Sequence, residues 1–139
     1  MKTLTADREL EIRFSEVDSM NVVWHGSYSL YFEDAREAFG AKYELSYQRY
    51  FNEGFFAPLV ELNFQYRKPL LYGMRPRIQI TYVPCEAAKI VFDYKIYNPD
   101  DGEVYATGRS VQVFMDHDYQ LVWFSPEFFE QWKRKWLYD

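Results

Sequence analysis

The sequence predicts an α+β protein in which an antiparallel sheet wraps around one long helix. Between residues 26 and 43, apolar side chains recur at spacings of three and four, which is typical of an amphipathic helix. From Ala57 to Phe124 the period changes to two, which is typical of successive strands separated by turns. The length of 139 residues suits one domain, and neither a linker-like stretch nor an internal repeat divides the chain. We therefore expect a single domain over residues 1–139.

The first element expected is a short strand over residues 9–14. Leu10, Ile12 and Phe14 alternate there with charged residues, as in a strand with one buried face. A loop over residues 15–24 follows, and it changes from polar to apolar just before the helix. A loop in this position is a candidate functional site.

The long helix is expected over residues 26–43. Its apolar face consists of aromatic and small side chains, namely Tyr28, Tyr31 or Phe32, Ala35, Phe39 and Tyr43. Ser46 can cap a second, shorter helix that runs to Asn52, and Gly54 can end it.

Strands are then expected over residues 59–67, 77–83, 89–97, 104–114 and 120–124. The segment 98–102, Asn-Pro-Asp-Asp-Gly, predicts a tight turn between two antiparallel strands. Gly108 interrupts a good strand, so we expect the backbone to curve there or to approach the helix closely. A final helix is expected with Ser125 as its N-cap and Pro126 at its first position.

Composition limits the classes of function. The net charge of −5 argues against a protein devoted to nucleic acid, although basic patches remain possible. No apolar run is long enough for a membrane span or a signal peptide, and Cys85 is the only cysteine, so we expect a cytoplasmic protein. His25 and His117 are far apart in the sequence, and neither has neighbours at metal-ligand spacing, so we expect no metal. Aromatic residues make up 21% of the chain, more than one small core easily buries, so some should line a pocket or a subunit contact.

The loop before the long helix offers groups suited to acyl transfer. Unpaired N–H groups at a helix start can stabilise an oxyanion, and Asp18 lies a few residues before that start. A carboxylate and N–H donors on opposite sides of one reacting carbon would be an acyl-transfer geometry. From spacing alone, an aspartate placed like Asp18 is a helix cap or a surface charge in most proteins, and a lone histidine placed like His25 is usually a packed side chain.

A longer motif adds to this interpretation. The residues are Asp18-x-x-Asn21-x-Val23-Trp24-His25-x-Ser27-Tyr28, followed by Phe32-Glu33-Asp34-Ala35-Arg36. This pattern resembles the signature of the hotdog-fold acyl-CoA thioesterases, the family named after 4-hydroxybenzoyl-CoA thioesterase. The order of expected elements over residues 11–125 is also similar to that family, as is the segment 66–70, Tyr-Arg-Lys-Pro-Leu.

The resemblance implies a hotdog fold and a role for each residue of the motif. Asp18 would attack the thioester carbonyl or activate water, and the helix start at Trp24 and His25 would stabilise the oxyanion. Tyr28 would belong to the substrate pocket. The sequence departs from the family at Asn21, where members usually have Gly, and at Ser27, where they commonly have Asn. Asn tolerates a left-handed backbone, so we expect the loop to keep its path.

The resemblance also implies an acyl-CoA substrate, no separate cofactor, and a homodimer or homotetramer with active sites between subunits. Candidate cations for the phosphates of coenzyme A are Arg67, Lys68, Arg75 and Arg77, although these are equally ordinary surface charges. One alternative is a non-catalytic hotdog protein that binds acyl thioesters. Another is a hotdog dehydratase acting on hydroxyacyl thioesters, although that branch arranges its motif His and its helical acid differently.

Overall fold

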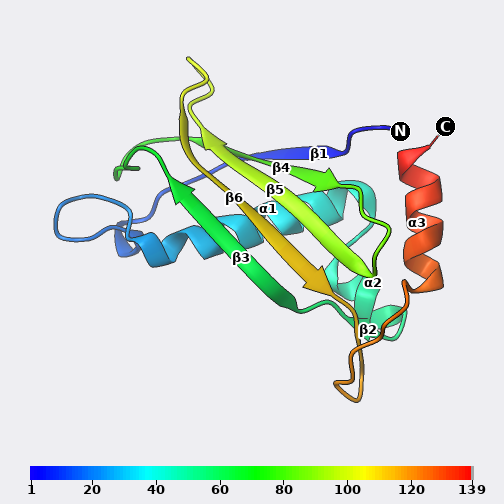
Figure 1. Cartoon of the computed structure of the whole chain (residues 1–139). Coiled ribbons are helices and arrows are strands. Elements are labelled where there is room, and N and C mark those ends of the chain that lie inside the picture. The colour runs from blue at the N-terminus through cyan, green and yellow to red at the C-terminus, as the bar shows by residue number, and fades with distance from the viewer. Residues whose placement is uncertain (139) are drawn as a thin grey trace.

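The computed structural model describes residues 1–138 and confirms the predicted α+β architecture. Five antiparallel strands form a sheet in the order β1-β4-β5-β6-β3, and helix α1 lies along one face of it (Figure 1). These elements are β1 (Thr5–Glu9), α1 (Tyr28–Tyr43), β3 (Leu59–Tyr66), β4 (Arg77–Val83), β5 (Lys89–Tyr97) and β6 (Val104–Val113). The shorter elements are 3-10 turns at Phe14–Glu16 and His25–Ser27, α2 (Tyr47–Asn52), β2 (Phe55–Phe56), β7 (Met115–Asp116) and α3 (Glu127–Leu137).

Helix α1 buries the aromatic face that its sequence predicts. Its six predicted core residues are all buried: Tyr28, Tyr31, Phe32, Ala35, Phe39 and Tyr43. The α-helix begins at Tyr28 because a 3-10 turn at His25–Ser27 forms its first turn. It ends at Glu44, whose φ of +58° turns the chain toward α2. This arrangement leaves the N-terminal end of the helix next to the preceding loop.

The closest contact between α1 and the sheet forms at Gly108 of β6. The ring of Phe32 stacks on Tyr94 of β5, with 4.0 Å between the centroids and an interplanar angle of 8°. A Cβ atom on Gly108 would overlap this Phe32 ring. The close approach predicted at Gly108 is therefore confirmed, and it draws α1 onto the middle of the sheet.

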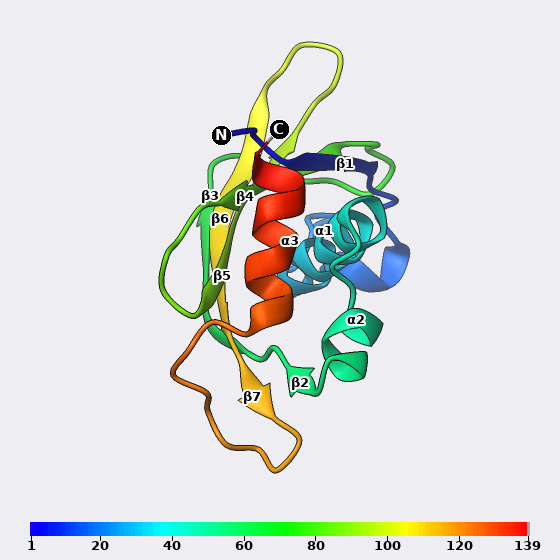
Figure 2. The same cartoon turned by 90° about the vertical axis from the view of Figure 1, so that its right-hand side faces the viewer.

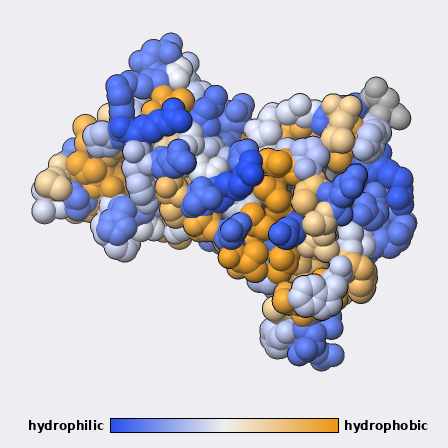
Figure 3. Space-filling model, in the orientation of Figure 1, coloured by the Kyte–Doolittle hydropathy of each residue, from blue (hydrophilic) through white to orange (hydrophobic). Residues whose placement is uncertain are grey.

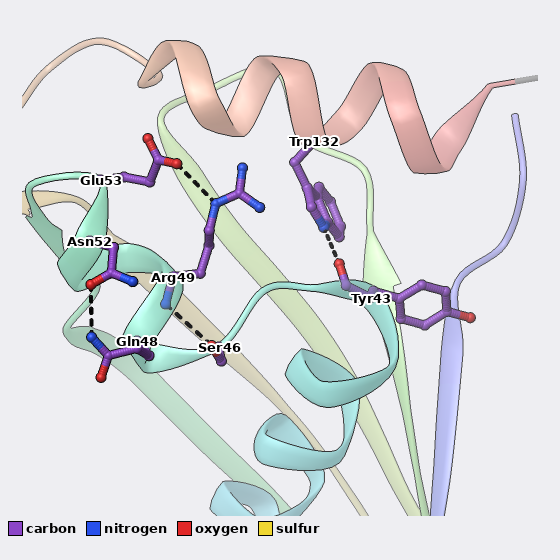
Figure 4. A network of polar contacts seen from close by, with 7 residues as sticks. All are labelled: Tyr43, Ser46, Gln48, Arg49, Asn52, Glu53 and Trp132. Atoms are coloured by element: carbon purple, nitrogen blue, oxygen red, sulfur yellow. Dashed lines mark hydrogen bonds and ion pairs between the residues drawn. The ribbon is translucent and has the colours of Figure 1, made fainter.

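Helices α2 and α3 close the end of the molecule at which α1 finishes (Figure 2). As predicted, Ser46 caps α2, its Oγ accepting a hydrogen bond of 3.2 Å from the Arg49 amide (Figure 4). Trp132 of α3 donates its indole N–H to the Tyr43 carbonyl at 2.6 Å, which ties α3 to the last turn of α1. No helix within residues 1–138 combines the length and the apolar character needed to cross a membrane.

The first strand lies earlier in the chain than predicted. The prediction over residues 9–14 is wrong, because β1 runs from Thr5 to Glu9 and pairs with β4. The next bond joins the Leu10 amide to the carbonyl of Pro76, and proline has no N–H with which to continue the ladder. Leu10 and Ile12 remain buried beyond the strand, whereas Phe14 is 77% exposed.

The segment after β7 also differs from the prediction. Residues 120–124 form no strand, and Leu121 makes only an isolated bridge to Met115. Trp123 is 87% exposed, so the apolar alternation in this segment does not reflect a buried face. Helix α3 begins at Glu127 with Pro126 at the N-cap position, and the Ser125 side chain makes no cap bond. Pro126 takes this place because its φ of −58° and ψ of 145° lie just outside the helix.

The face shown in Figure 3 carries an apolar area within a hydrophilic surface. Hydrophobic residues gather there over the neighbouring ends of β3, β5 and β6. Strand β3 lies at one edge of the sheet that residues 1–138 form. Three of its apolar side chains are more than a third exposed, namely Leu59, Val60 and Tyr66. An exposed apolar edge strand of this kind is suited to pairing with another strand.

Candidate active site

A pocket of about 410 Å³ opens between the loop before α1 and the end of β3. It is lined by Asp18, Val22, Val23, Trp24, His25, Tyr28, Tyr66, Arg67, Lys68 and Pro69. The structure thus brings six of the eight predicted site residues together. They come from two segments about 40 positions apart in the sequence, which the contact between α1 and the sheet places side by side.

Asp18 organises the tight turn that leads to the pocket. Its Oδ1 accepts hydrogen bonds from the backbone amides of Met20, at 2.8 Å, and Val22, at 3.2 Å. Asn21 completes the turn with a φ of +66°, the left-handed backbone that asparagine was expected to tolerate. No hydrogen bond reaches Oδ2 of Asp18 from residues 1–138. One carboxylate oxygen is therefore fixed by the backbone while the other is available.

The start of the helix supplies N–H donors at the same pocket. His25 and Gly26 are the first two residues of the 3-10 turn, and their amides have no hydrogen-bond acceptor within the described chain. Ser27 is buried, and its Oγ donates to the carbonyl of Glu16 at 3.2 Å. The Trp24 amide donates to that same carbonyl at 2.8 Å. Ser27, where the family commonly has Asn, thus holds the helix start against the preceding loop.

Aromatic packing fixes the shape of this turn. The Trp24 indole packs against the His25 imidazole, with 4.9 Å between ring centroids. A Cβ atom at Gly26 would overlap the indole, so glycine allows the indole to lie this close to the turn. The imidazole of His25 is exposed, while its carbonyl accepts a hydrogen bond of 3.2 Å from the Tyr66 hydroxyl. This bond joins the end of β3 to the helix start.

Two phenols in the first turns of α1 stay protonated at neutral pH, and one of them, Tyr28, lines the pocket. Burial, together with the neighbouring Tyr66, raises the pKa of Tyr28 to about 12. Burial and a hydrogen bond to Glu16 also raise the pKa of Tyr31, whose hydroxyl donates to Oε1 of Glu16 at 3.0 Å. A phenol with a raised pKa acts as a hydrogen-bond donor and not as a base. Among these residues, the carboxylate of Asp18 is therefore the group best suited to attack or to accept a proton.

The predicted cluster of four basic residues is divided between two places. Arg67 and Lys68 line the pocket, and Lys68 also pairs with Glu103. Arg75 instead lies 3.1 Å from Glu9, and Arg77 pairs with Asp7. Both carboxylates belong to β1, so these two arginines lie near the opposite edge of the sheet from β3. They are close to Arg67 in the sequence, but Arg77 begins β4 and Arg75 directly precedes it, and β5 and β6 separate β4 from β3.

Two groups in or beside the pocket were not predicted as site residues. Tyr66 lines the pocket and donates its hydroxyl to the His25 carbonyl, and Gly26, next to the lining residue His25, has a free amide. The position of Tyr66 directly before Arg67 and Lys68, at the end of a strand, was the sequence signal for it. The Gly26 amide had no side-chain signal, because only the backbone takes part.

Comparison with known proteins agrees with this geometry. A family model of the thioesterase-like superfamily matches residues 12–132. A Bacillus subtilis protein named "Putative acyl-CoA thioesterase YneP" is 31% identical over 111 residues, which cover 80% of each chain. The DHNA-CoA thioesterase structure from Staphylococcus aureus is 25% identical, with a TM-score of 0.77, over 94% of this chain and 90% of that one.

A third similarity concerns the fold. The structure of a thioesterase from Thermus thermophilus, complexed with coenzyme A and Zn, superimposes with a TM-score of 0.75 at 18% identity. The match covers 94% of this chain and 92% of that one. The sheet around a central helix is thus the hotdog arrangement that the motif implied. With the match over residues 12–132, the chain belongs to the thioesterase-like superfamily.

Proposed function

We propose that this protein hydrolyses an acyl-CoA thioester to a free acid and coenzyme A, with Asp18 as the catalytic carboxylate. The family makes the protein a thioester hydrolase, and the B. subtilis relative is named for acyl-CoA. One observation carries the choice of residues. Asp18 and His25 line one pocket, and the free amides of His25 and Gly26 lie at the helix start beside it.

In the proposed reaction, the thioester carbonyl oxygen accepts hydrogen bonds from the amides of His25 and Gly26. Asp18 either removes a proton from an attacking water or attacks the carbonyl carbon itself. In both cases a tetrahedral oxyanion forms, and the two amides stabilise its charge. The C–S bond then breaks, and the thiolate of coenzyme A leaves and takes up a proton. In the nucleophilic route, water subsequently hydrolyses the anhydride and regenerates Asp18.

We also propose that Arg67 and Lys68 bind phosphates of coenzyme A at the mouth of the pocket. Arg67 makes no ion pair within residues 1–138, so its guanidinium is available to an anion. Arg75 and Arg77 do not line this pocket and pair instead with carboxylates of β1, so we omit them from this role. Coenzyme A would enter as part of the substrate, and the reaction needs no further cofactor.

We propose that the active form is at least a homodimer, formed through β3. The support is an edge strand with exposed Leu59, Val60 and Tyr66, next to the apolar area of Figure 3. Pairing of two β3 strands would satisfy the backbone groups at this edge. It would also cover part of the aromatic surface that the composition predicts.

The proposed function is tested by incubating the protein with a panel of acyl-CoA thioesters and measuring the release of free thiol. Turnover of at least one substrate supports hydrolysis. Thermal stabilisation by these thioesters without thiol release would instead support a binding protein. Hydration or dehydration of a hydroxyacyl or enoyl thioester, without thiol release, would support the dehydratase alternative.

A further inference from the structure

The backbone carbonyl of Glu16 holds the start of the helix in place. It accepts hydrogen bonds from the Trp24 amide at 2.8 Å and from the Ser27 Oγ at 3.2 Å. Between these two donors in the chain lie His25 and Gly26, whose amides are free. Because the residue before this pair and the residue after it are both tied to one oxygen atom, Glu16 determines where the free amides lie.

Glu16 also limits where the carboxylate of Asp18 can lie. Only Val17 separates the two residues, and Val17 forms an antiparallel bridge with Val23. The Asp18 amide donates to the Val22 carbonyl at 2.8 Å, which continues this short ribbon. The carboxylate and the amides at the helix start are therefore both anchored through Glu16.

The side chain of Glu16 is held by α1. Its Oε1 accepts a hydrogen bond of 2.7 Å from the Arg13 amide and one of 3.0 Å from the Tyr31 hydroxyl. The bond to Arg13 closes an exposed turn within the same segment. Tyr31 instead belongs to α1, fifteen positions further along the chain. Its hydroxyl thus joins the loop that carries Asp18 to the central helix.

Tyr31 is well suited to fix a position because it is itself immobilised. The residue is 2% exposed, and its ring packs edge-on against Tyr28, with 5.9 Å between the centroids. A closely packed aromatic side chain on a helix has little rotamer freedom, so its hydroxyl stays at a defined point. Reacting groups are held precisely when such locked side chains on a rigid element support them.

We propose that Tyr31 is a positioning residue for the hydrolysis of the thioester. By donating to Glu16, its hydroxyl keeps the carboxylate of Asp18 and the free amides at the helix start at the separation that the reaction needs. Tyr31 does not line the pocket at Asp18, so it acts through Glu16 and not on the substrate. This inference rests on the proposed function.

The test compares Tyr31→Phe with Tyr43→Phe. Tyr43 is a second buried tyrosine of α1, in its last turn (Figure 4), and its hydroxyl donates to the Thr5 carbonyl at 2.9 Å. Each variant loses one hydroxyl that bonds to another segment and keeps the ring, so both should lose similar stability. With an acyl-CoA that the unmodified protein hydrolyses, Tyr31→Phe should lower kcat about tenfold or more and change KM less than about twofold. Tyr43→Phe should leave kcat unchanged.

Variants of Glu16 test the same hydrogen bond from its other end. Glu16→Gln keeps an oxygen that can accept from Tyr31 and should retain most of the activity, whereas Glu16→Ala should lower kcat at least as much as Tyr31→Phe. The double variant Tyr31→Phe/Glu16→Ala should lose no more than Glu16→Ala alone, because the bond is already absent. Since Glu16 is only partly buried, these variants also decide the question if Tyr31→Phe does not fold.

An NMR spectrum of the ¹⁵N-labelled full chain measures the positioning without any turnover. The amide signals of His25 and Gly26 should shift in Tyr31→Phe and stay in place in Tyr43→Phe. Unshifted amides, or a kcat that Tyr31→Phe leaves unchanged or that both phenylalanine variants lower equally, would overturn the role of Tyr31. If the unmodified protein releases no thiol from any acyl-CoA, the proposed function itself is contradicted, and the catalytic role of Tyr31 with it, even where the amides shift.

Discussion

At the scale of single residues, Asn21 shows how the catalytic loop is shaped. Its φ of +66° follows directly from the turn that Asp18 closes with its two amide hydrogen bonds. Asn21→Ala should destabilise the protein by about 1 kcal/mol, because a residue with a Cβ and no polar side chain disfavours this backbone conformation. The free energy of unfolding in urea measures this effect.

Asn21→Gly is the control for this prediction. Glycine takes positive φ values freely, so its unfolding free energy should stay close to that of the unmodified protein. If the alanine variant were as stable as the glycine variant, the left-handed turn would not depend on the residue at this position.

The residues of the site differ in how well the sequence predicts them. Asp18, Trp24 and His25 lie in one short segment, so a motif is enough to bring them together. Arg75 is only eight positions from Arg67, yet the fold separates them, because Arg75 pairs with Glu9 of edge strand β1 whereas Arg67 follows β3 at the other edge. Proximity along the chain does not give the order of strands, and that order decides which basic residues share a pocket.

At the scale of elements, Gly108 sets the distance between α1 and the sheet. Gly108→Ala should destabilise the protein by about 1–3 kcal/mol, because the added methyl group would overlap both the Asn63 carbonyl of β3 and the Phe32 ring in a packed core. Thermal or urea unfolding measures the loss. In a double variant with Phe32→Leu, the alanine should cost less, since the smaller side chain leaves room for it.

An additive result in that double variant would contradict this explanation, because it would show that the Phe32 ring is not the group that the added methyl meets. The loss of stability would then come from overlap between the added methyl group and the backbone of β3, whose Asn63 carbonyl also lies against Gly108.

The elements themselves follow from the sequence where period and turn chemistry agree. Strands β4 and β5 have the predicted bounds, because alternating side chains end at clear turn signals such as Asn98–Gly102. The two failures, over residues 9–14 and 120–124, also show alternation. Alternation of apolar and polar residues indicates which side chains face inward, but a strand also needs a neighbouring strand to which its backbone can hydrogen-bond. Pro76 and the turn after Asp116 remove that partner.

At the scale of the whole molecule, the proposed assembly depends on the edge strand β3. Val60→Lys places a charge on this edge, where Val60 is 56% exposed, and in a symmetric pair it would bring two like charges into the interface. The molecular mass measured by analytical ultracentrifugation should fall from that of an oligomer to that of the 16.9 kDa chain. The control is Lys95→Gln, a change on β5 away from this edge, which should not alter the mass.

An unmodified protein that sediments as a monomer would contradict the proposed dimer. So would an oligomer that Val60→Lys leaves intact, since the contact would then lie on another surface.

The most direct test of the proposed mechanism is the rate of thiol release by Asp18→Asn, measured with an acyl-CoA that the unmodified protein hydrolyses. Asparagine keeps the size of the side chain and an oxygen for the amides of Met20 and Val22, but it removes the charge. Turnover should therefore fall at least about 100-fold, while coenzyme A still binds. His25→Ala retains the backbone N–H and should lose at least about tenfold less activity. Near-normal turnover by a folded and assembled Asp18→Asn protein would contradict the catalytic role of Asp18.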